Sequence, residues 1–180
     1  MSAQDHRRIV RASRGDVTAF GQLVREHSGL VRGISVQILG REEAQDACQE
    51  VWVRVWRHLG DFRGDSSFTT WLRTITVNTC LSLHKKASRR EEYAFGGGVP
   101  DLVEPSGGDA DPEASAIGSE RRDEISVYLR QVREEHRAAL ILRYLEGLSY
   151  AEIAEVLDVP SGTARGWASR GRAAMLVALS

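Results

Sequence analysis

Two short helical patterns separated by a proline occupy residues 148–179, and no other stretch constrains the fold of this chain as strongly. Ser149 followed by Glu152 is the capping-box pattern that starts a helix, in which each side chain bonds to the backbone N–H of the other residue. Apolar residues then recur at helical spacing on one side, namely Leu148, Ile153, Ala154 and Leu157. Proline cannot continue a helix, so Asp158-Val159-Pro160 ends this one. With Ser161 as the cap of a second helix, the pattern predicts a helix-turn-helix.

The second helix of this pair has a polar and basic outer surface. The residues that we expect at its outward positions are Thr163, Arg165, Ser169, Arg170 and Arg172. Residues 161–180 contain no acidic side chain. Short polar side chains at the start of a helix, followed by arginines, suit the major groove of DNA, where they meet base edges and phosphates. The alternative interpretation is a helical hairpin with a solvated basic surface.

The composition is that of a globular protein that stays in the cytoplasm. Hydrophobic residues make up 42% and charged residues 27% of the 180-residue chain, which are ordinary proportions for a soluble protein. We expect no membrane insertion and no secretory signal, because no apolar run has the length of a membrane span and the first residues lack an apolar core. Cys48 and Cys80 lie inside helical patterns without metal-binding spacing, so we expect both to be buried small hydrophobes.

The charges are unevenly distributed along the chain. Residues 1–92 contain 15 Lys and Arg against 11 Asp and Glu, residues 93–120 contain six acidic and no basic residues, and residues 121–180 contain nine basic against eight acidic residues. The formal net charge is −1. Tight binding of DNA by a free protein usually depends on the neutralisation of phosphates. We therefore expect a partner to supply much of the affinity if this chain binds DNA.

Outside the acidic residues 93–120, the sequence predicts helices throughout. Apolar residues at helical spacing indicate helices over residues 16–39, 42–59, 68–87, 120–132 and 134–146, followed by the helix-turn-helix. The inner stripe of the second helix is Ala44, Ala47, Cys48, Val51, Val55, Trp56 and Leu59. Glycines and prolines rule out a regular element over residues 94–118, which predicts a flexible linker between two helical bodies. The predicted fold class is all-α.

A loop rich in glycine, aspartate and serine at residues 61–67 precedes the third helix, which opens with aromatic side chains. Rings next to cationic and amide groups are what unpaired nucleic-acid bases need, because bases stack on rings and phosphates bind lysine and arginine. Phe68, Trp71 and the basic residues at the end of the same helix fit this description. Taken one at a time, Phe68 and Trp71 are better explained as core residues. The combination with the loop and the helix-turn-helix favours nucleic acid.

Four further patterns occur in a fixed order and cover most of the chain outside the predicted linker. They are A-F-G-Q-L-V-R-E-H, E-E-A-Q-D-A-C-Q-E-V-W-V-R-V-W, F-R-G-D-S-S-F-T-T-W-L and E-E-H-R-A-A-L-I-L-R-Y-L-E-G-L-S-Y-A-E-I-A-E-V-L-D-V-P-S-G-T-A-R. No single one is diagnostic, but the ordered set is specific. In this set and order the chain resembles the extracytoplasmic-function (ECF), or group IV, sigma factors of the sigma-70 family.

The resemblance implies two small helical domains on a tether. Residues 1–92 would form a domain like sigma region 2, which binds the clamp of RNA polymerase and melts the minus-ten element of a promoter. Residues 93–119 would be a flexible acidic linker that is threaded through the RNA channel of the polymerase. Residues 120–180 would form a helix-turn-helix domain like sigma region 4, which reads the minus-thirty-five element as duplex DNA.

The resemblance also assigns residues to three sites. The polymerase set comprises Asp46, Gln49, Glu50 and Arg54. The minus-ten set comprises Arg63, Gly64, Asp65, Ser66, Phe68, Trp71, Asn78, Lys85 and Lys86. The minus-thirty-five set comprises Ser161, Thr163, Arg165, Ser169, Arg170 and Arg172.

The second helix of the helix-turn-helix departs from the family pattern. Ala164 stands where a bulky aliphatic residue is usual, and Trp167 stands where a smaller or basic residue is usual. Gly166 and Gly171 each lower helix propensity by about 1 kcal/mol relative to alanine. We expect either a soft recognition helix or a tryptophan that fills the space left by the alanine.

The implied function is that of a transcription initiation factor whose partners are core RNA polymerase, promoter DNA and commonly an anti-sigma factor. No catalytic residue, metal, cofactor or small-molecule substrate is implied. The first alternative, a helix-turn-helix regulator that binds operators alone, needs an oligomerisation surface, and no coiled-coil heptad is present in the sequence. The second alternative, an enzyme, is disfavoured because the five histidines show no metal or acid–base spacing.

Overall fold

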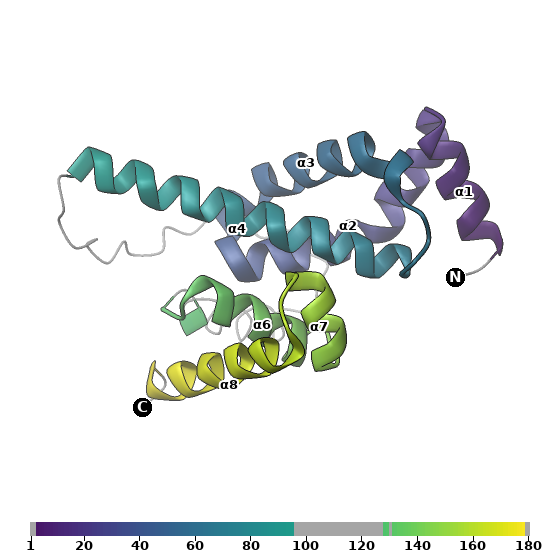
Figure 1. Ribbon diagram of the computed structural model, residues 1–180. Helices are drawn as coiled ribbons and strands as arrows, with labels where there is room; N and C mark the ends of the chain where they lie inside the picture. Colours follow the sequence, from purple (N-terminus) through teal and green to yellow (C-terminus); the bar gives the residue numbers. More distant parts are fainter. Residues whose placement is uncertain (1–2, 96–127, 130, 179–180) are drawn as a thin grey trace, which may run out of the picture.

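The computed structural model describes residues 3–95, 128–129 and 131–178, and every regular element in these ranges is a helix (Figure 1). The N-terminal elements are α1 (Ala3–Ser13), α2 (Val17–Leu39), α3 (Arg41–His58), the 3₁₀ turn η1 (Leu59–Asp61) and α4 (Phe68–Phe95). The C-terminal elements are α6 (Glu134–Tyr144), α7 (Tyr150–Leu157) and α8 (Ser161–Ala178). The all-α class is confirmed. Figure 1 shows α6, α7 and α8 as a second body lying against α2 and α4.

The structure differs from the sequence-based prediction in two places. Helix α1 is absent from that prediction: among its residues from His6 on, Ile9 and Ala12 are the buried ones, and two apolar positions in a polar sequence are too few to indicate a helix. Helix α4 continues to Phe95 and not to Ala87, since no glycine or proline interrupts it before Gly96. Of the helix predicted over 120–132, residues 120–127 and 130 lie outside the described residues, as does most of the predicted linker, whereas Tyr128 and Leu129 are helical.

The side chain of Asp16 caps α2. The carboxylate of Asp16 accepts the backbone N–H of Ala19 at 2.9 Å and the Nε–H of Arg11 at 2.8 Å. Donation by the Ala19 backbone, and then by Arg11, holds the pKa of Asp16 below its usual value. Its negative charge at the N-terminus of the helix also complements the helix dipole.

The helix-turn-helix forms largely as predicted. The capping box of α7 is confirmed: the Ser149 hydroxyl accepts the backbone N–H of Glu152, and the Glu152 carboxylate accepts the backbone N–H of Ser149. Asp158, at φ 51°, adopts the left-handed conformation that ends α7. The prediction that Ser161 is the cap of α8 is wrong by one position. Ser161 is the first helical residue, and the carbonyl of Pro160 accepts the N–H of Ala164.

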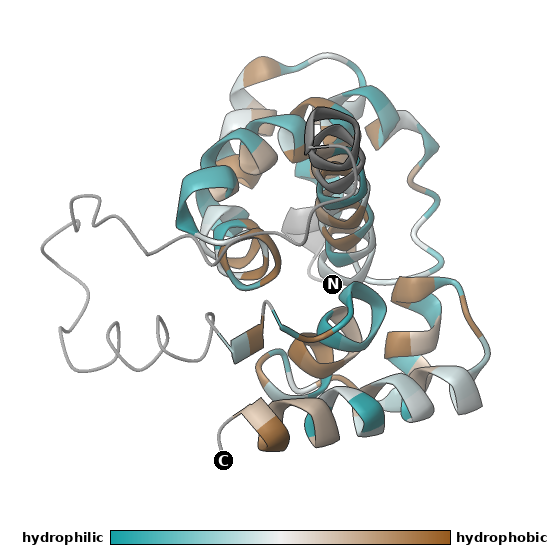
Figure 2. Ribbon diagram, turned by 90° about the vertical axis from the view of Figure 1, so that its left-hand side faces the viewer, coloured by the Kyte–Doolittle hydropathy of each residue, from teal (hydrophilic) through white to brown (hydrophobic). Residues whose placement is uncertain are grey.

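Two hydrophobic clusters hold the described part of the chain together. The N-terminal core consists of Ile9, Ala12, Ala19, Leu23, Val31, Val51, Val55, Leu59, Phe68 and Leu72. The shared core takes Ile34, Ile38, Leu39, Ala47, Val77 and Cys80 from the N-terminal helices, and Leu129, Ala138, Ala139, Leu140, Ile141, Leu142, Leu148, Ile153, Val156, Ala164 and Ala168 from the C-terminal part. Figure 2 shows the amphipathic pattern behind both clusters, with apolar and polar residues on different sides of the helices.

The cysteines contribute to packing. Cys80 is fully buried, and burial raises the pKa of its thiol to about 11, so it is unreactive at neutral pH. Cys48 is half-buried and packs against the N-terminal core, which is less burial than the sequence predicts. Within the ranges that the structure describes, none of the helices has both the length and the apolar character needed to cross a membrane.

Candidate functional site

Helix α8 approaches α6 on small residues. Ala164, Ala168 and Gly171 are the buried positions of α8, and a Cβ atom added at Gly171 would lie 2.7 Å from the carbonyl oxygen of His136. Trp167 is half-buried against the shared core. The prediction that Trp167 fills space beside Ala164 agrees with this placement. Gly171, by contrast, is required by the close approach of α6, so its presence does not indicate an unstable recognition helix.

The minus-thirty-five set divides over two sides of α8. Ser161, Arg165, Ser169 and Arg172 recur at intervals of three or four residues and are exposed, so they share one side of the helix. Thr163 and Arg170 are seven residues apart and lie on the opposite flank of the helix, about 150° away at about 100° per residue, where Thr163 is half-buried and Arg170 is exposed. The arginines of the set therefore face solvent and are not turned into their own core.

An aromatic ring that the sequence reasoning missed supports Arg165. The guanidinium carbon of Arg165 lies 5.3 Å from the ring centroid of Tyr150, the first residue of α7. The guanidinium of Arg143 lies 4.9 Å from the same ring and donates to the carbonyl of Leu148 at 2.8 Å. Cations within about 6 Å of an aromatic ring are attracted to it. Tyr150 thus links the end of α6, the start of α7 and the recognition helix α8.

A histidine on α6 supports Arg170. The Nε–H of Arg170 donates to Nε2 of His136 at 3.2 Å. Burial, and then the positive charges of Arg170 and Arg133, lower the pKa of His136. The imidazole is therefore neutral at neutral pH and can accept this hydrogen bond. Both arginines are held by neighbouring helices but keep donors that remain open to a ligand.

The loop before α4 is open to solvent. Arg63, Gly64 and Asp65 are exposed and Ser66 is half-buried. Gly64 has φ 80°, a conformation that favours glycine over residues with a side chain. The loop is anchored by Ser67, whose hydroxyl accepts the backbone N–H of Thr70 at 3.0 Å and so caps α4. The sequence analysis did not identify this cap.

The aromatic residues beside this loop form a cluster with a buried and an accessible part. Phe68 is only 4% exposed, so it is a core residue and has no ring surface free to stack on a base. Phe62 and Trp71 are half-buried, with ring centroids 5.3 Å apart, and each lies 5.8 Å from the ring of Phe68. The expectation for Phe68 is corrected accordingly: it supports the rings of Trp71 and Phe62, which are the accessible ones.

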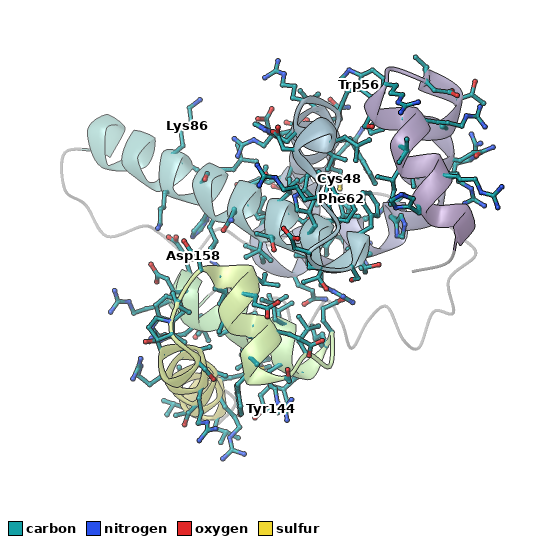
Figure 3. All side chains as sticks on the ribbon, turned by 45° about the vertical axis from the view of Figure 1, so that its right-hand side comes forward. Cys48, Trp56, Phe62, Lys86, Tyr144 and Asp158 are labelled. Carbon is teal, nitrogen blue, oxygen red and sulfur yellow. The ribbon has the colours of Figure 1, made fainter. Side chains whose placement is uncertain are left out.

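The rest of α4 presents polar groups on the side that carries Trp71. Asn78 lies seven residues after Trp71, and Lys85 lies seven residues after Asn78, which places all three on one side of the helix. Asn78, Lys85 and Lys86 are exposed, and Lys86 points away from the C-terminal domain (Figure 3). Lys85 also lies 3.8 Å from a carboxylate oxygen of Glu135.

Helix α3 turns its polar residues outward. Asp46 and Gln49 are exposed, and Glu50 is half-buried and accepts the Nε–H of Arg54 at 2.8 Å in an i,i+4 pair. Trp56 is 39% exposed at the edge of the molecule, 4.8 Å from the ring of Phe20, so its prediction as an inner-stripe residue is corrected (Figure 3). The described residues contain no group of histidines, cysteines or carboxylates that could hold a metal ion.

Comparison with known proteins assigns each of the two helical bodies to a protein family. The chain matches the sigma-70 region 2 family over residues 23–90 and the sigma-70 region 4 family over residues 122–175. It is 36% identical to the RNA polymerase sigma-H factor of Pseudomonas aeruginosa over 185 aligned residues, covering 98% of this chain and 94% of that protein. It belongs to the ECF sigma factors of the sigma-70 family. It is also 32% identical to the ECF sigma-E factor of Escherichia coli K12, with 93% of this chain and 90% of that protein covered.

Solved structures share the fold of this sigma factor. CnrH, in complex with the cytosolic domain of CnrY, superposes with a TM-score of 0.64 at 23% identity, covering 97% of this chain and 96% of that one. The sigma factor RpoE of Bartonella quintana, in complex with the anti-sigma factor NepR, superposes with a TM-score of 0.68 at 21% identity, covering 91% and 98%. The sigma factor directs promoter-specific transcription initiation and is not an enzyme.

Proposed function

We propose that the three sets of residues divide the work of initiation between the two domains of the sigma factor. The domain of residues 1–92 binds the polymerase clamp and the melted minus-ten element, and the domain of residues 120–180 binds the minus-thirty-five element as duplex. The observation that supports this most is the outward placement of the loop 63–66 and of Arg165 and Arg170, none of which is sealed in a core.

The polymerase set lies on a solvent-facing side of α3. Asp46, Gln49 and Glu50 contribute to no core, because Ala44, Ala47, Val51 and Val55 form the buried side of the same helix. Two exposed apolar side chains, Val53 at 42% and Trp56 at 39%, accompany them. Apolar residues ringed by charged ones are typical of protein interfaces, so α3 fits a protein partner better than it fits DNA.

The minus-ten set combines an exposed loop with a supported ring. The loop 63–66 and the ring of Trp71 lie at the start of α4, with Asn78, Lys85 and Lys86 further along it. A base removed from the stack needs a polar pocket or an aromatic surface, and the strand that carries it needs cations. This arrangement supplies both along one side of one helix.

The minus-thirty-five set lies on a helix that packs closely on its domain through small residues and turns its longer side chains outward. Short side chains such as Ser161 and Thr163 stand at the N-terminal end of α8, and arginines follow. This order fits a recognition helix whose first turns read base edges while later arginines bind phosphates. The arginines are held by Tyr150 and His136, which fixes their direction before DNA arrives.

The proposal also covers the segment between the two domains and one further protein partner. We propose that residues 93–119, which contain acidic but no basic residues, act as a flexible linker through the RNA channel of the polymerase. An anti-sigma factor is a further proposed partner. Among the similar structures, RpoE is bound to the anti-sigma factor NepR, and CnrH is bound to the cytosolic domain of CnrY. The near-neutral net charge of −1 supports weak binding of free DNA, with affinity gained through linked sites in the holoenzyme.

The test is transcription by purified sigma factor and core polymerase from a pool of random promoters. We expect selective initiation, which is lost on Glu50→Arg and weakened by Gln49→Ala, whereas Arg14→Glu on the exposed segment after α1 leaves it unchanged. Selective initiation that survives both substitutions on α3 would remove the polymerase contact. Tight, specific gel shifts by the free protein would support the alternative of an independent helix-turn-helix regulator.

A further inference from the structure

The guanidinium of Arg170 lies over the backbone of the recognition helix. A Cβ atom added at Gly166 would lie 3.3 Å from Nη1 and 3.4 Å from Nη2 of Arg170. At about 100° per residue, Gly166 is on the side of α8 opposite to its buried positions, which are Ala164, Ala168 and Gly171. The absence of a side chain at Gly166 therefore leaves room for the guanidinium on the side of α8 that faces solvent.

The same guanidinium is bonded to the neighbouring helix. Its Nε–H donates to Nε2 of His136 at 3.2 Å, and α6 and α8 lie side by side (Figure 1). Because an arginine can only donate, the imidazole has to present Nε2 without a proton and carry its proton on Nδ1. Within the described residues this is the one hydrogen bond of the Arg170 side chain, so both Nη groups are available to a ligand.

The surroundings of His136 disfavour a charged imidazole. His136 is the third residue of α6, where the positive end of the helix dipole opposes a cation. Burial, and then the charges of Arg170 and Arg133, lower the pKa of His136 from its usual value of 6.5. Glu135 acts in the opposite direction, and residues 161–180 supply no further carboxylate. Among the residues that the structure describes, Arg170, Arg133 and Glu135 are the charged groups that act on this ring.

Protonation of His136 would turn this attractive contact into a repulsive one. A protonated imidazole donates from both nitrogens, so Nε2 no longer accepts from Arg170. Two positively charged groups would then be in contact, with Arg133 as a further cation nearby. The guanidinium would leave its place over Gly166 and sample many rotamers, and it would have to lose this freedom again on binding DNA.

We propose that His136 is a positioning residue for Arg170 and makes the selectivity of the sigma factor for its minus-thirty-five element sensitive to pH. The neutral ring fixes the guanidinium before DNA arrives, and the charged ring releases it. Release lowers selectivity more than affinity, because a mobile arginine and an imidazolium still attract the phosphates of any sequence. The inference rests on the proposed function for the place of Arg170 in the minus-thirty-five site, whereas the contact with His136 does not.

The first experiment measures the contact in the absence of DNA. The pKa of His136 is followed by NMR titration in the full chain and in Arg170→Met, which keeps a long side chain without the charge. Removal of the cation should raise the pKa of His136 toward its usual value. The pKa of His6, an exposed residue of α1, should stay the same in both chains. A pKa of His136 that is equal in both chains overturns the contact.

The second experiment measures binding of the holoenzyme to two promoters. One is the promoter that the wild type selects from the random pool, and the other carries a scrambled minus-thirty-five element. For the wild type, we expect the ratio of the two affinities to fall about threefold or more between about pH 8 and about pH 5.5, because a net hydrogen bond is lost. His136→Gln offers an uncharged amide oxygen and should keep the high ratio at both pH values. His136→Leu should have the low ratio throughout, and His6→Gln should behave as the wild type does.

Three results would overturn the proposal: a wild-type ratio that does not change with pH, a fall that persists in His136→Gln, or full selectivity in His136→Leu. If His136→Leu fails to fold, the pH profile of His136→Gln decides alone. A ratio at about pH 8 that is equal in Arg170→Met and wild type contradicts the proposed place of Arg170 in the minus-thirty-five site. The NMR titration then still decides whether His136 holds that arginine.

Discussion

The two candidate DNA sites of this sigma factor are built in opposite ways. Beside the loop 63–66, large rings cluster, and the buried Phe68 supports the accessible Trp71 and Phe62. On α8, small residues face the domain and let the backbone approach α6, while the functional side chains project outward. A site for unpaired bases needs a fixed aromatic surface, whereas a site for duplex needs a helix whose outer side is not covered by its own domain.

Because the two sites are built differently, substitutions in them should have different effects on the fold and on DNA binding. The aromatic site derives its shape from the N-terminal core, so most changes there alter a surface and leave the fold in place. The recognition helix derives its position from contacts at the backbone level, so a single added carbon can displace it. Substitutions at Gly171 and at Trp71 should separate a displaced helix from an altered surface.

Gly171→Ala should have the largest effect and should damage only the duplex site. The added Cβ would lie 2.7 Å from the backbone carbonyl oxygen of His136, which cannot move aside as a flexible side chain could. We expect a loss of about 3 kcal/mol in the free energy of unfolding, measured by denaturant titration. Recognition of the minus-thirty-five element should fall with it. Gly166→Ala is the matched control for the unfolding measurement, because its Cβ meets only the far end of the Arg170 side chain, at 3.3 Å, and no backbone atom, and alanine gains helix propensity.

Trp71→Leu should produce the converse result. Leucine keeps an apolar side chain against Phe62 and Phe68 but removes the ring on which a base would stack. We expect about a tenfold loss of open complexes on a promoter, because stacking of one base on a ring contributes ~1–3 kcal/mol. Minus-thirty-five binding should stay at the wild-type level. The measurement is permanganate footprinting of the melted strand, with Trp71→Phe as the variant that retains a ring; equal opening by both variants would remove stacking from the proposal.

The contrast between the sites also explains what could be predicted from the sequence. Periodic apolar residues and caps report local structure, so α2, α3, α6 and the capping box of α7 are found where the pattern places them. Burial is a tertiary property. The sequence cannot tell that Phe68 faces the core while Trp71 stays half-buried, because both stand near the start of the same helix.

The supports of the arginines were beyond prediction for the same reason. Tyr150 and His136 are separated from Arg165 and Arg170 by 15 and 34 residues, and only the packing of α6, α7 and α8 brings each pair together. Helix propensity does not account for Gly171, because propensity describes an isolated helix, whereas the backbone of α6 decides which residue fits here. A glycine inside a helical pattern can therefore mark a close contact between helices as well as a local weakness.

Ser149→Ala should have a smaller effect that depends on pH. The Ser149 hydroxyl and backbone N–H both donate to Glu152 and hold the pKa of that carboxyl below its usual value. A lowered carboxyl pKa gives stability that is present at neutral pH and is lost as the pH falls through the folded pKa. We expect the variant to lose about 1 kcal/mol at pH 7. The difference from wild type should shrink on acidification, as followed by thermal unfolding; a difference that stays constant with pH would contradict the role of Glu152.

Tyr150→Leu should have the smallest effect and should sharpen the comparison most, because it asks whether a ring matters at the duplex site too. Here the ring does not stack on a base but holds the guanidinium of Arg165 at 5.3 Å. An exposed cation–π contact contributes about 0.5–1 kcal/mol, so we expect minus-thirty-five binding by the holoenzyme to weaken roughly two- to fivefold. Tyr150→Phe keeps the ring and should bind as wild type does. In an Arg165→Ala background, Tyr150→Leu should cause no further loss, since its effect passes through that arginine. An equal loss in both backgrounds would make Tyr150 a packing residue of α7 and leave aromatic rings to the single-strand site alone.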